Sequence, residues 1–141
     1  MKIRKFKSGD AKACSRIIYS CLDNMKMDKK FKKFLKEKDT PNGIIKTSKE
    51  ADIFIYENNG KILGLGKLED RKIGMMFIDI KNQRKGIGKA ILIYLEKLAK
   101  KRGKRKVWLN SFIGATKFYK KFDYEKAGKR DRDAIKMEKL L

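Results

Sequence analysis

The segment from residue 53 to residue 102 constrains the fold most, because three strand-like stretches run directly into one long amphipathic helix. Asn59-Gly60 lies between the first two stretches and predicts a two-residue hairpin, since both turn positions need a positive φ. The apolar residues of 86–102 recur at helical spacing, and Gly103 marks the end of that helix. The expected strands are residues 53–57, 61–68 and 73–80. A meander followed by a helix predicts a domain of the α/β class.

The other elements follow from the same periodicities. Ser8 is positioned to cap a helix, and Thr40-Pro41 forms an N-cap followed by proline at the first helical position. A lysine-rich segment between those helices carries Phe31, Phe34 and Leu35 at helical spacing. The expected strands are residues 1–6, 107–110 and 134–141, and the expected helices are residues 11–25, 40–51 and 114–122. The predicted order is β-α-α-β-β-β-α-β-α-β.

The length and the hydropathy pattern favour one domain without a membrane span. The chain has 141 residues, which suits a single domain over residues 1–141 with a sizeable core. No apolar run approaches the ~20 residues that cross a bilayer. Residues 1–10 alternate charged and apolar side chains, unlike the apolar block of a signal peptide. We therefore expect a cytoplasmic protein.

The two cysteines, Cys14 and Cys21, lie in one predicted helix. Their spacing corresponds to a rise of roughly 10 Å along a helix, which is too long for a disulfide. We expect both to be small, buried, reduced side chains. The sequence has no histidine and no C-x-x-C pair, so it predicts no metal site.

The charge admits two interpretations. The chain has 39 basic and 17 acidic residues, a formal net charge of +22, and such an excess attracts polyanions. A nucleic-acid-binding protein is therefore one hypothesis. The basic residues are mostly lysines spread over the whole chain, however, with no interleaved exposed aromatics and no helix-turn-helix or RNP-like motif. We favour a compositional origin and expect no nucleic-acid partner.

The start of the long helix carries the most specific chemistry. Gly86 and Gly88 let the backbone approach a ligand closely, and the free N–H groups of a helix start form an anion site. Arg84, Lys85 and Lys89 add positive charge around it. The spacing fits neither a Walker A loop nor the G-x-G-x-x-G dinucleotide fingerprint. The loop predicts a pyrophosphate site.

Two segments resemble the GNAT family of N-acetyltransferases. Residues 77–89 (FIDIKNQRKGIGK) resemble the family's Q/R-x-x-G-x-G/A motif with the strand before it. Residues 115–124 (ATKFYKKFDY) resemble A-x-x-F-Y-x-x-x-G-F/Y, in the usual order and at the usual separation. Asp123 replaces the family's glycine, and aspartate tolerates a left-handed cap better than most residues. The resemblance covers most of the chain and leaves about residues 26–38 unplaced.

The resemblance implies an α/β (α+β) fold, a GNAT-like single domain whose central mixed, mostly antiparallel sheet is flanked by helices. It implies acetyl-CoA as co-substrate and no metal. The implied reaction moves the acetyl group to a primary amine by direct attack on the thioester. A GNAT fold that binds CoA without catalytic activity is an alternative.

The resemblance also implies the ligand-binding residues. Backbone groups of Met76, Phe77 and Ile78 would pair with the pantetheine arm. Asn110 is a further candidate CoA ligand, although counting back from the second motif places the family's position near Phe112. The residues of the pyrophosphate loop would be Gln83, Arg84, Lys85, Gly86, Ile87, Gly88 and Lys89.

Tyr119 matches the tyrosine that family members use to protonate the departing thiolate. A phenol does so only when it is positioned by its surroundings. The alternative is an amphipathic tyrosine packed beside Phe118 and Phe122. With no histidine, the general base would be a carboxylate, a tyrosine or water, and the carboxylate candidates are Glu69, Asp70 and Asp79.

The sequence does not name the acceptor, which is a small molecule or a protein. In the family, its site comes from the variable N-terminal helices, here about residues 22–49. The sequence also leaves a homodimer open.

Overall fold

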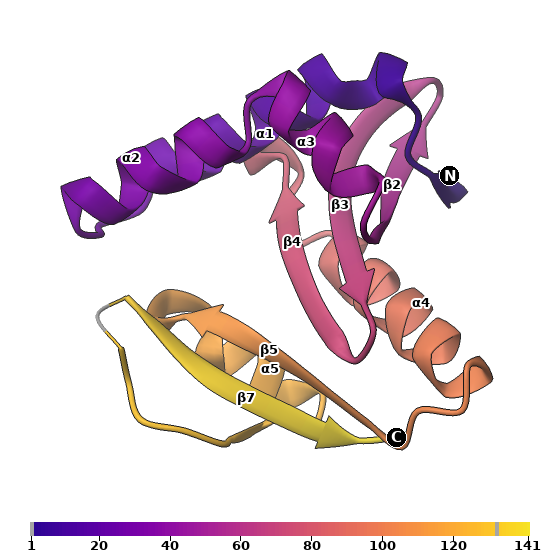
Figure 1. Cartoon of the computed structure of the whole chain (residues 1–141), viewed down its shortest axis with the longest axis vertical. Coiled ribbons are helices and arrows are strands. Elements are labelled where there is room, and N and C mark those ends of the chain that lie inside the picture. The colour runs from indigo at the N-terminus through magenta and orange to yellow at the C-terminus, as the bar shows by residue number, and fades with distance from the viewer. Residues whose placement is uncertain (1, 132) are drawn as a thin grey trace.

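Alternating inward and outward side chains build one seven-stranded sheet in the order β1-β2-β3-β4-β5-β7-β6. The computed structural model describes residues 2–131 and 133–141. All neighbouring strands are antiparallel except β4 and β5, which are parallel. The mixed, mostly antiparallel sheet that we expected is therefore confirmed (Figure 1). The strands are β1 (Lys2–Lys5), β2 (Asp52–Asn58), β3 (Lys61–Glu69), β4 (Lys72–Ile78), β5 (Lys106–Phe112), β6 (Glu125–Lys126) and β7 (Ala134–Leu140).

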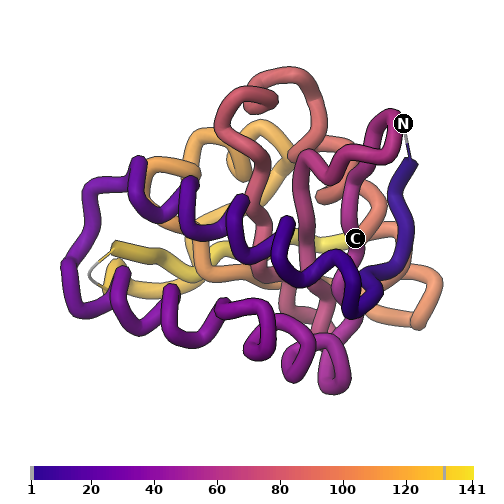
Figure 2. The backbone as a smooth tube through the Cα atoms, turned by 90° about the horizontal axis from the view of Figure 1, so that it is seen from above, coloured from indigo at the N-terminus to yellow at the C-terminus, as the bar shows by residue number. Residues whose placement is uncertain are grey.

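Helices cover both faces of the sheet and divide the core into two clusters. Successive residues of a strand point to opposite faces, so Phe54 belongs to one cluster while Ile53 and Ile55 belong to the other. The first cluster packs under α4 and α5, and the second packs under α1 and α3. Figure 2 shows α1 running beside the α2–α3 segment. The α-helices are α1 (Ala11–Asp23), α2 (Lys29–Lys38), α3 (Pro41–Ser48), α4 (Ile87–Lys101) and α5 (Thr116–Lys121).

Local signals account for several boundaries. The Thr40 hydroxyl accepts a hydrogen bond from the Gly43 N–H at 3.2 Å, which confirms the expected cap before Pro41. Asn59 and Gly60 both have positive φ, 52° and 77°, as the predicted hairpin requires. Asp123 also adopts a left-handed conformation, with φ of 70°.

Several elements differ from the expectations. Ser8 caps no helix; it begins a 3-10 turn, η1 (Ser8–Asp10), where the Asp10 carboxylate accepts from the Lys7 N–H at 2.7 Å. The lysine-rich segment forms a separate helix, α2, because the Asp28 carboxylate caps it by accepting from the Phe31 N–H at 3.1 Å. The short strand β6 was not expected at all, since a two-residue strand has no periodicity to detect.

The third predicted strand ends earlier than residue 80. Ile78 closes β4, and a 3-10 turn, η2 (Ile80–Asn82), follows it. No helix within residues 2–131 and 133–141 is long and apolar enough to cross a membrane.

Candidate functional site: a glycine loop between two diverging strands

The loop before α4 leaves the start of that helix open. Gly86 is the N-cap residue of α4 and has a φ of 85°, and Arg84 is also left-handed, at 64°. A Cβ added at Gly86 would meet no atom within 4 Å. The conformation therefore favours glycine, and the space beside its backbone is free for a ligand.

The first turn of α4 presents N–H groups that no earlier helical carbonyl can accept. The 15-residue helix sums its peptide dipoles to a partial positive charge at this end. Arg84, Lys85 and Lys89 are exposed around the loop, while Ile87 is buried and anchors it. This arrangement suits a ligand with several negative oxygens.

Side-chain hydrogen bonds hold the loop against the end of β4. The Gln83 amide donates to the Ile78 carbonyl at 3.1 Å, and the Cys21 thiol donates to the same carbonyl at 3.1 Å. The Asn82 amide donates to the Asp79 carboxylate at 2.7 Å and accepts from the Lys85 ammonium at 3.2 Å. Gln83 thus positions the loop through its side chain.

Strand β4 contains a bulge that breaks its alternation. Met75 has a φ of 49°, and the register against β3 shifts between Leu65 and Lys67. Ile73 and Met76 pack in the cluster under α4, whereas Met75 and Phe77 pack in the cluster under α1. In a regular strand, Ile73 and Met75 would share a face, so the bulge reverses the pattern and bends the strand.

The bulge coincides with the point where β4 leaves β5. The two strands pair only at Lys72 with Trp108 and Ile73 with Leu109. Beyond Ile73 no residue of β4 pairs with β5 in the part of the chain that the structure describes, and Figure 1 shows the strands diverging. Met76, Phe77 and Ile78 lie on this stretch. One edge of β4 there is free of strand pairing, and it leads to the glycine loop.

Helix α5 lies beside the start of α4. A Cβ added at Gly88 would meet the Phe118 ring at 3.2 Å, so the two residues are in close contact. Phe118 packs edge-on against both Tyr119 and Phe122, with ring centroids 5.1 Å apart in each pair. The two segments that carried the family resemblance are therefore brought together.

Tyr119 is buried in the cluster under α4, with 7% of its surface exposed. Its ring also contacts Tyr124, with centroids 5.7 Å apart. Its hydroxyl has no hydrogen-bond partner among residues 2–131 and 133–141. Burial raises the pKa of Tyr119 well above its usual value, so the phenol keeps its proton across the neutral range.

A buried polar network holds Tyr124, whose ring contacts the Tyr119 ring. The Tyr124 hydroxyl donates to Glu96 at 2.7 Å, and the Lys139 ammonium donates to the other oxygen of Glu96 at 3.0 Å. Glu96 lies on α4 and is 8% exposed. Burial and the Glu96 carboxylate together raise the pKa of Tyr124. The network joins α4 to β7 and fixes the ring that Tyr119 contacts.

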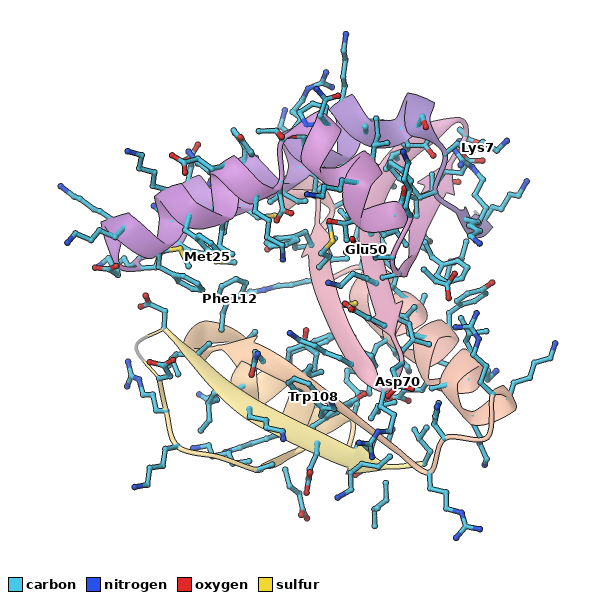
Figure 3. All side chains as sticks on the ribbon, viewed as in Figure 1. Lys7, Met25, Glu50, Asp70, Trp108 and Phe112 are labelled. Atoms are coloured by element: carbon cyan, nitrogen blue, oxygen red, sulfur yellow. The ribbon has the colours of Figure 1, made fainter. Side chains whose placement is uncertain are left out.

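Asn110 lies on β5, and no contact joins it to the glycine loop among residues 2–131 and 133–141. It is exposed on β5, in register with Lys136 of β7 and on the face that also carries Trp108 and Phe112. The Phe112 ring reaches the other half of the sheet, where its centroid lies 6.1 Å from that of Phe77. Figure 3 shows Phe112 near Met25, toward the N-terminal helices.

The candidate bases occupy the two ends of β4. Glu69 and Asp70 lie at the β3–β4 turn, where β4 still pairs with β5. The Lys104 ammonium lies 2.7 Å from the Asp70 carboxylate. This contact is the main reason why the pKa of Asp70 is lower than usual. Asp79 directly follows β4, next to the loop. These positions separate Asp79 from the other two.

Sequence reasoning missed the bulge at Met75 and the side chains that β5 presents on the sheet face opposite α4 and α5, chiefly Trp108 and Phe112. Two adjacent methionines and a glycine at residues 74–76 were the only signal of a bulge. The pairing of Trp108 with Lys72 depends on a contact between distant segments, which no local pattern records.

The chain is similar to known proteins in sequence and in fold. A family model described as "Acetyltransferase (GNAT) domain" matches residues 11–139. No curated protein matches the sequence. Among solved structures, a GCN5-related N-acetyltransferase from Rhodopseudomonas palustris superposes with a TM-score of 0.90 at 18% identity, covering 99% of this chain and 95% of that one.

Two further structures contain coenzyme A. The PaiA N-acetyltransferase from Thermoplasma acidophilum has a TM-score of 0.82 at 18% identity and covers 99% of this chain and 98% of that one. An aminoglycoside 6'-N-acetyltransferase has a TM-score of 0.77 at 14% identity and covers 99% and 97%. At these identities the superpositions establish the fold alone, and the family assignment comes from the sequence match over residues 11–139. The chain belongs to the GNAT family of acetyltransferases.

Proposed function

We propose that this chain is an acetyl-CoA-dependent N-acetyltransferase that moves the acetyl group to a primary amine. One observation carries the proposal: an open helix start at Gly86 lies at the end of a strand, β4, whose edge separates from β5. The unpaired edge of β4 leads to the anion site at the helix start. This arrangement suits a ligand that has a pyrophosphate at one end and an amide-rich arm at the other.

The residues present fit coenzyme A. The N–H groups from residue 84 to residue 89, with the cations of that loop, would hold the pyrophosphate. The backbone of Met76, Phe77 and Ile78 would pair with the amides of the pantetheine arm. Gly86 leaves the approach open, because nothing lies within 4 Å of the position that a Cβ would take. Asn110 would contact the ligand only from the β5 side of the opening.

The bound thioester supplies an acyl carbon that an amine can attack. The nitrogen–carbon bond forms first and the carbon–sulfur bond breaks afterwards, and backbone N–H groups of β4 would stabilise the oxyanion between these steps. The Tyr119 hydroxyl gives its proton to the departing thiolate. The proton that the amine must lose goes to water or to Asp79, the candidate carboxylate that lies nearest in sequence to the loop. We propose no metal in this reaction.

Ligand-dependent thermal unfolding tests the cofactor. Acetyl-CoA at 100 times its Kd should stabilise the folded protein by about 2.7 kcal/mol and raise Tm. Gly86→Glu should abolish this shift, because it places a carboxylate in the anion site. Gly103→Glu is the matched control: Gly103 has a φ of 82°, has equally open surroundings and lies at the other end of the same helix.

A Gly86→Glu protein that still responds to acetyl-CoA like the wild type would contradict the loop assignment. Release of free thiol in the presence of a panel of amines then tests the transfer itself. Binding without any thiol release would favour a CoA-binding GNAT fold that has lost activity.

A further inference from the structure

The face of β5 and β7 that looks toward the N-terminal helices carries an unusual group of side chains. Lys72, Trp108 and Lys136 come from three adjacent strands, β4, β5 and β7. The Lys72 ammonium lies 5.0 Å from the centroid of the Trp108 ring, and the Lys136 ammonium lies 4.8 Å from it. Two cations thus gather on the single tryptophan of the chain.

These two cations lack carboxylate partners. Neither Lys72 nor Lys136 forms an ion pair within 4.0 Å in the described residues 2–131 and 133–141. The nearby carboxylates are engaged elsewhere. Glu138, which is in register with Trp108, pairs with Lys106 at 3.4 Å, and Glu69, in register with Lys72, pairs with Lys67 at 3.6 Å.

A third lysine, Lys67 on β3, adds positive charge on the other side of β4. Lys67 is 6% exposed, and a Cβ added at Gly74 would meet its side chain at 3.3 Å. Burial, and then the nearby charges of Lys38 and Lys72, lower the pKa of Lys67 despite the opposing effect of Glu69. The positive charges of these lysines repel one another because they are close together, and a bound anion would reduce this repulsion.

The position of this cluster relates it to the proposed reaction. Lys72 is only three residues before Met75, which is ~10 Å along a strand. Within residues 2–131 and 133–141, the side chains of β5 and β7 that pack in the cluster under α4 and α5 are those of the opposite face, such as Val107, Leu109 and Met137. The Trp108 face therefore lies open beside the point where β4 and β5 separate.

We propose that the Trp108 face, meaning Lys72, Trp108 and Lys136, binds a carboxylate of the acceptor, so that the preferred acceptor is a primary amine that also carries a carboxylate. This inference rests on the proposed acetyltransferase function. The two ammonium groups pair with the carboxylate, and the indole packs against the acceptor's methylene chain. The amine end then reaches toward the bulge at Met75.

A matched pair of acceptors tests the proposal. The two groups of 6-aminohexanoate lie roughly 7–8 Å apart when the chain is extended, and 6-aminohexanamide differs only in lacking the charge. We expect kcat/KM for the acid to exceed that for the amide by about tenfold or more, the size of one charge-assisted contact. In the Lys72→Met/Lys136→Met protein this ratio should fall close to unity, while kcat/KM for the amide is retained.

A control separates local binding from general attraction. Lys61→Met/Lys101→Met removes the same charge from two exposed positions away from the face and should leave the ratio unchanged. An equal loss in the control protein would overturn the proposal in favour of long-range steering. Equal turnover of acid and amide by the wild type would also overturn it while leaving the acetyltransferase function intact.

The fluorescence of Trp108 gives a second measurement that needs no turnover. In the presence of CoA, 6-aminohexanoate should change the emission saturably, 6-aminohexanamide should not, and the double variant should show no change. No response to the acid by the wild type, or a change in its oligomeric state on Lys72→Met/Lys136→Met substitution, would overturn the assignment. Loss of CoA-dependent stabilisation in the wild type would instead refute the proposed function.

Discussion

Phe118 of α5 lies directly on Gly88 of α4, at a distance where an added Cβ would meet the ring at 3.2 Å. Such an approach is closer than most side chains allow, so the ring would have to move. Tyr119 follows Phe118 in the chain and stacks edge-on against it. The second glycine of the loop is therefore tied to the position of the candidate proton donor as well as to ligand access.

This contact predicts that Gly88→Val destabilises the protein by about 1–3 kcal/mol through overpacking against Phe118. The free energy of unfolding in urea measures the effect. Phe118→Leu removes part of the ring and should recover much of the loss when the two substitutions are combined. Additive effects in the double variant would show that the contact does not limit residue 88.

Tyr119→Phe keeps the buried ring and removes only the hydroxyl. If this hydroxyl protonates the thiolate, kcat should fall by roughly 100-fold or more with little change in KM. Because burial raises the pKa of Tyr119, the wild-type hydroxyl should remain a donor up to at least about pH 10. Tyr94→Phe, on the partly exposed side of α4, is the control. An unchanged kcat would identify Tyr119 as a packing residue.

The Tyr124–Glu96–Lys139 network predicts a coupled loss of stability. Tyr124→Phe removes the 2.7 Å hydrogen bond to Glu96 and should cost about 1–3 kcal/mol, because the carboxylate is buried. Glu96→Gln weakens the contact with the Lys139 ammonium as well and should cost more. A double-mutant cycle with urea unfolding measures the coupling, and a coupling energy near zero would contradict the network.

The elements that could be predicted are those with local causes. Examples are the hairpin turn at Asn59-Gly60, the helix cap at Thr40 and the apolar face of α4. Each depends only on residues within one turn or one hairpin. Helix α2 was left out of the predicted order, although Phe31, Phe34 and Leu35 stand at helical spacing and Asp28 at its start was a readable cap. The resemblance implied a mixed, mostly antiparallel sheet but no order of strands within it, since strand pairing depends on contacts between distant segments.

The candidate site likewise has a part that could be predicted from local residues and a part that could not. The glycine loop is a local motif, and the sequence located it to the residue. The bulge at Met75, by contrast, arises from the mismatch between β3 and β4, and the separation of β4 from β5 depends on which residues of β5 pair with Lys72 and Ile73. The sequence therefore identified the loop that we propose for the phosphates, but not the opening that we propose for the acceptor.

The cysteines should be unreactive in the folded protein. Burial raises the pKa of Cys14 to about 12 and that of Cys21 to about 11, so at pH 8 both thiols stay protonated and shielded. We expect a thiol reagent to modify neither group on the timescale on which it modifies both in urea. Rapid modification of the native protein would contradict the packing of α1 against the sheet.

The pair formed by Arg4 and Asp10 predicts how stability depends on pH. Partial burial of Asp10 would raise its pKa, but hydrogen bonds from the Arg4 guanidinium at 3.0 Å and from the Lys7 N–H at 2.7 Å outweigh burial, so the net pKa is lowered. A carboxyl with a lowered pKa stabilises the folded state at every pH above its unfolded value of about 3.9.

Asp10→Asn should accordingly lower the free energy of unfolding by about 1.5–3 kcal/mol at pH 7, the usual value of hydrogen bonds to a charged group. The stabilisation is lost as the pH falls through the folded pKa of Asp10, so the wild-type and Asp10→Asn proteins should become equally stable at low pH. Urea unfolding at pH 7, 5, 4 and 3 measures this difference, with Glu125→Gln as an exposed control. A difference that stays constant across this range would mean that Asp10 acts through shape and neutral hydrogen bonds, and not through its charge beside Arg4.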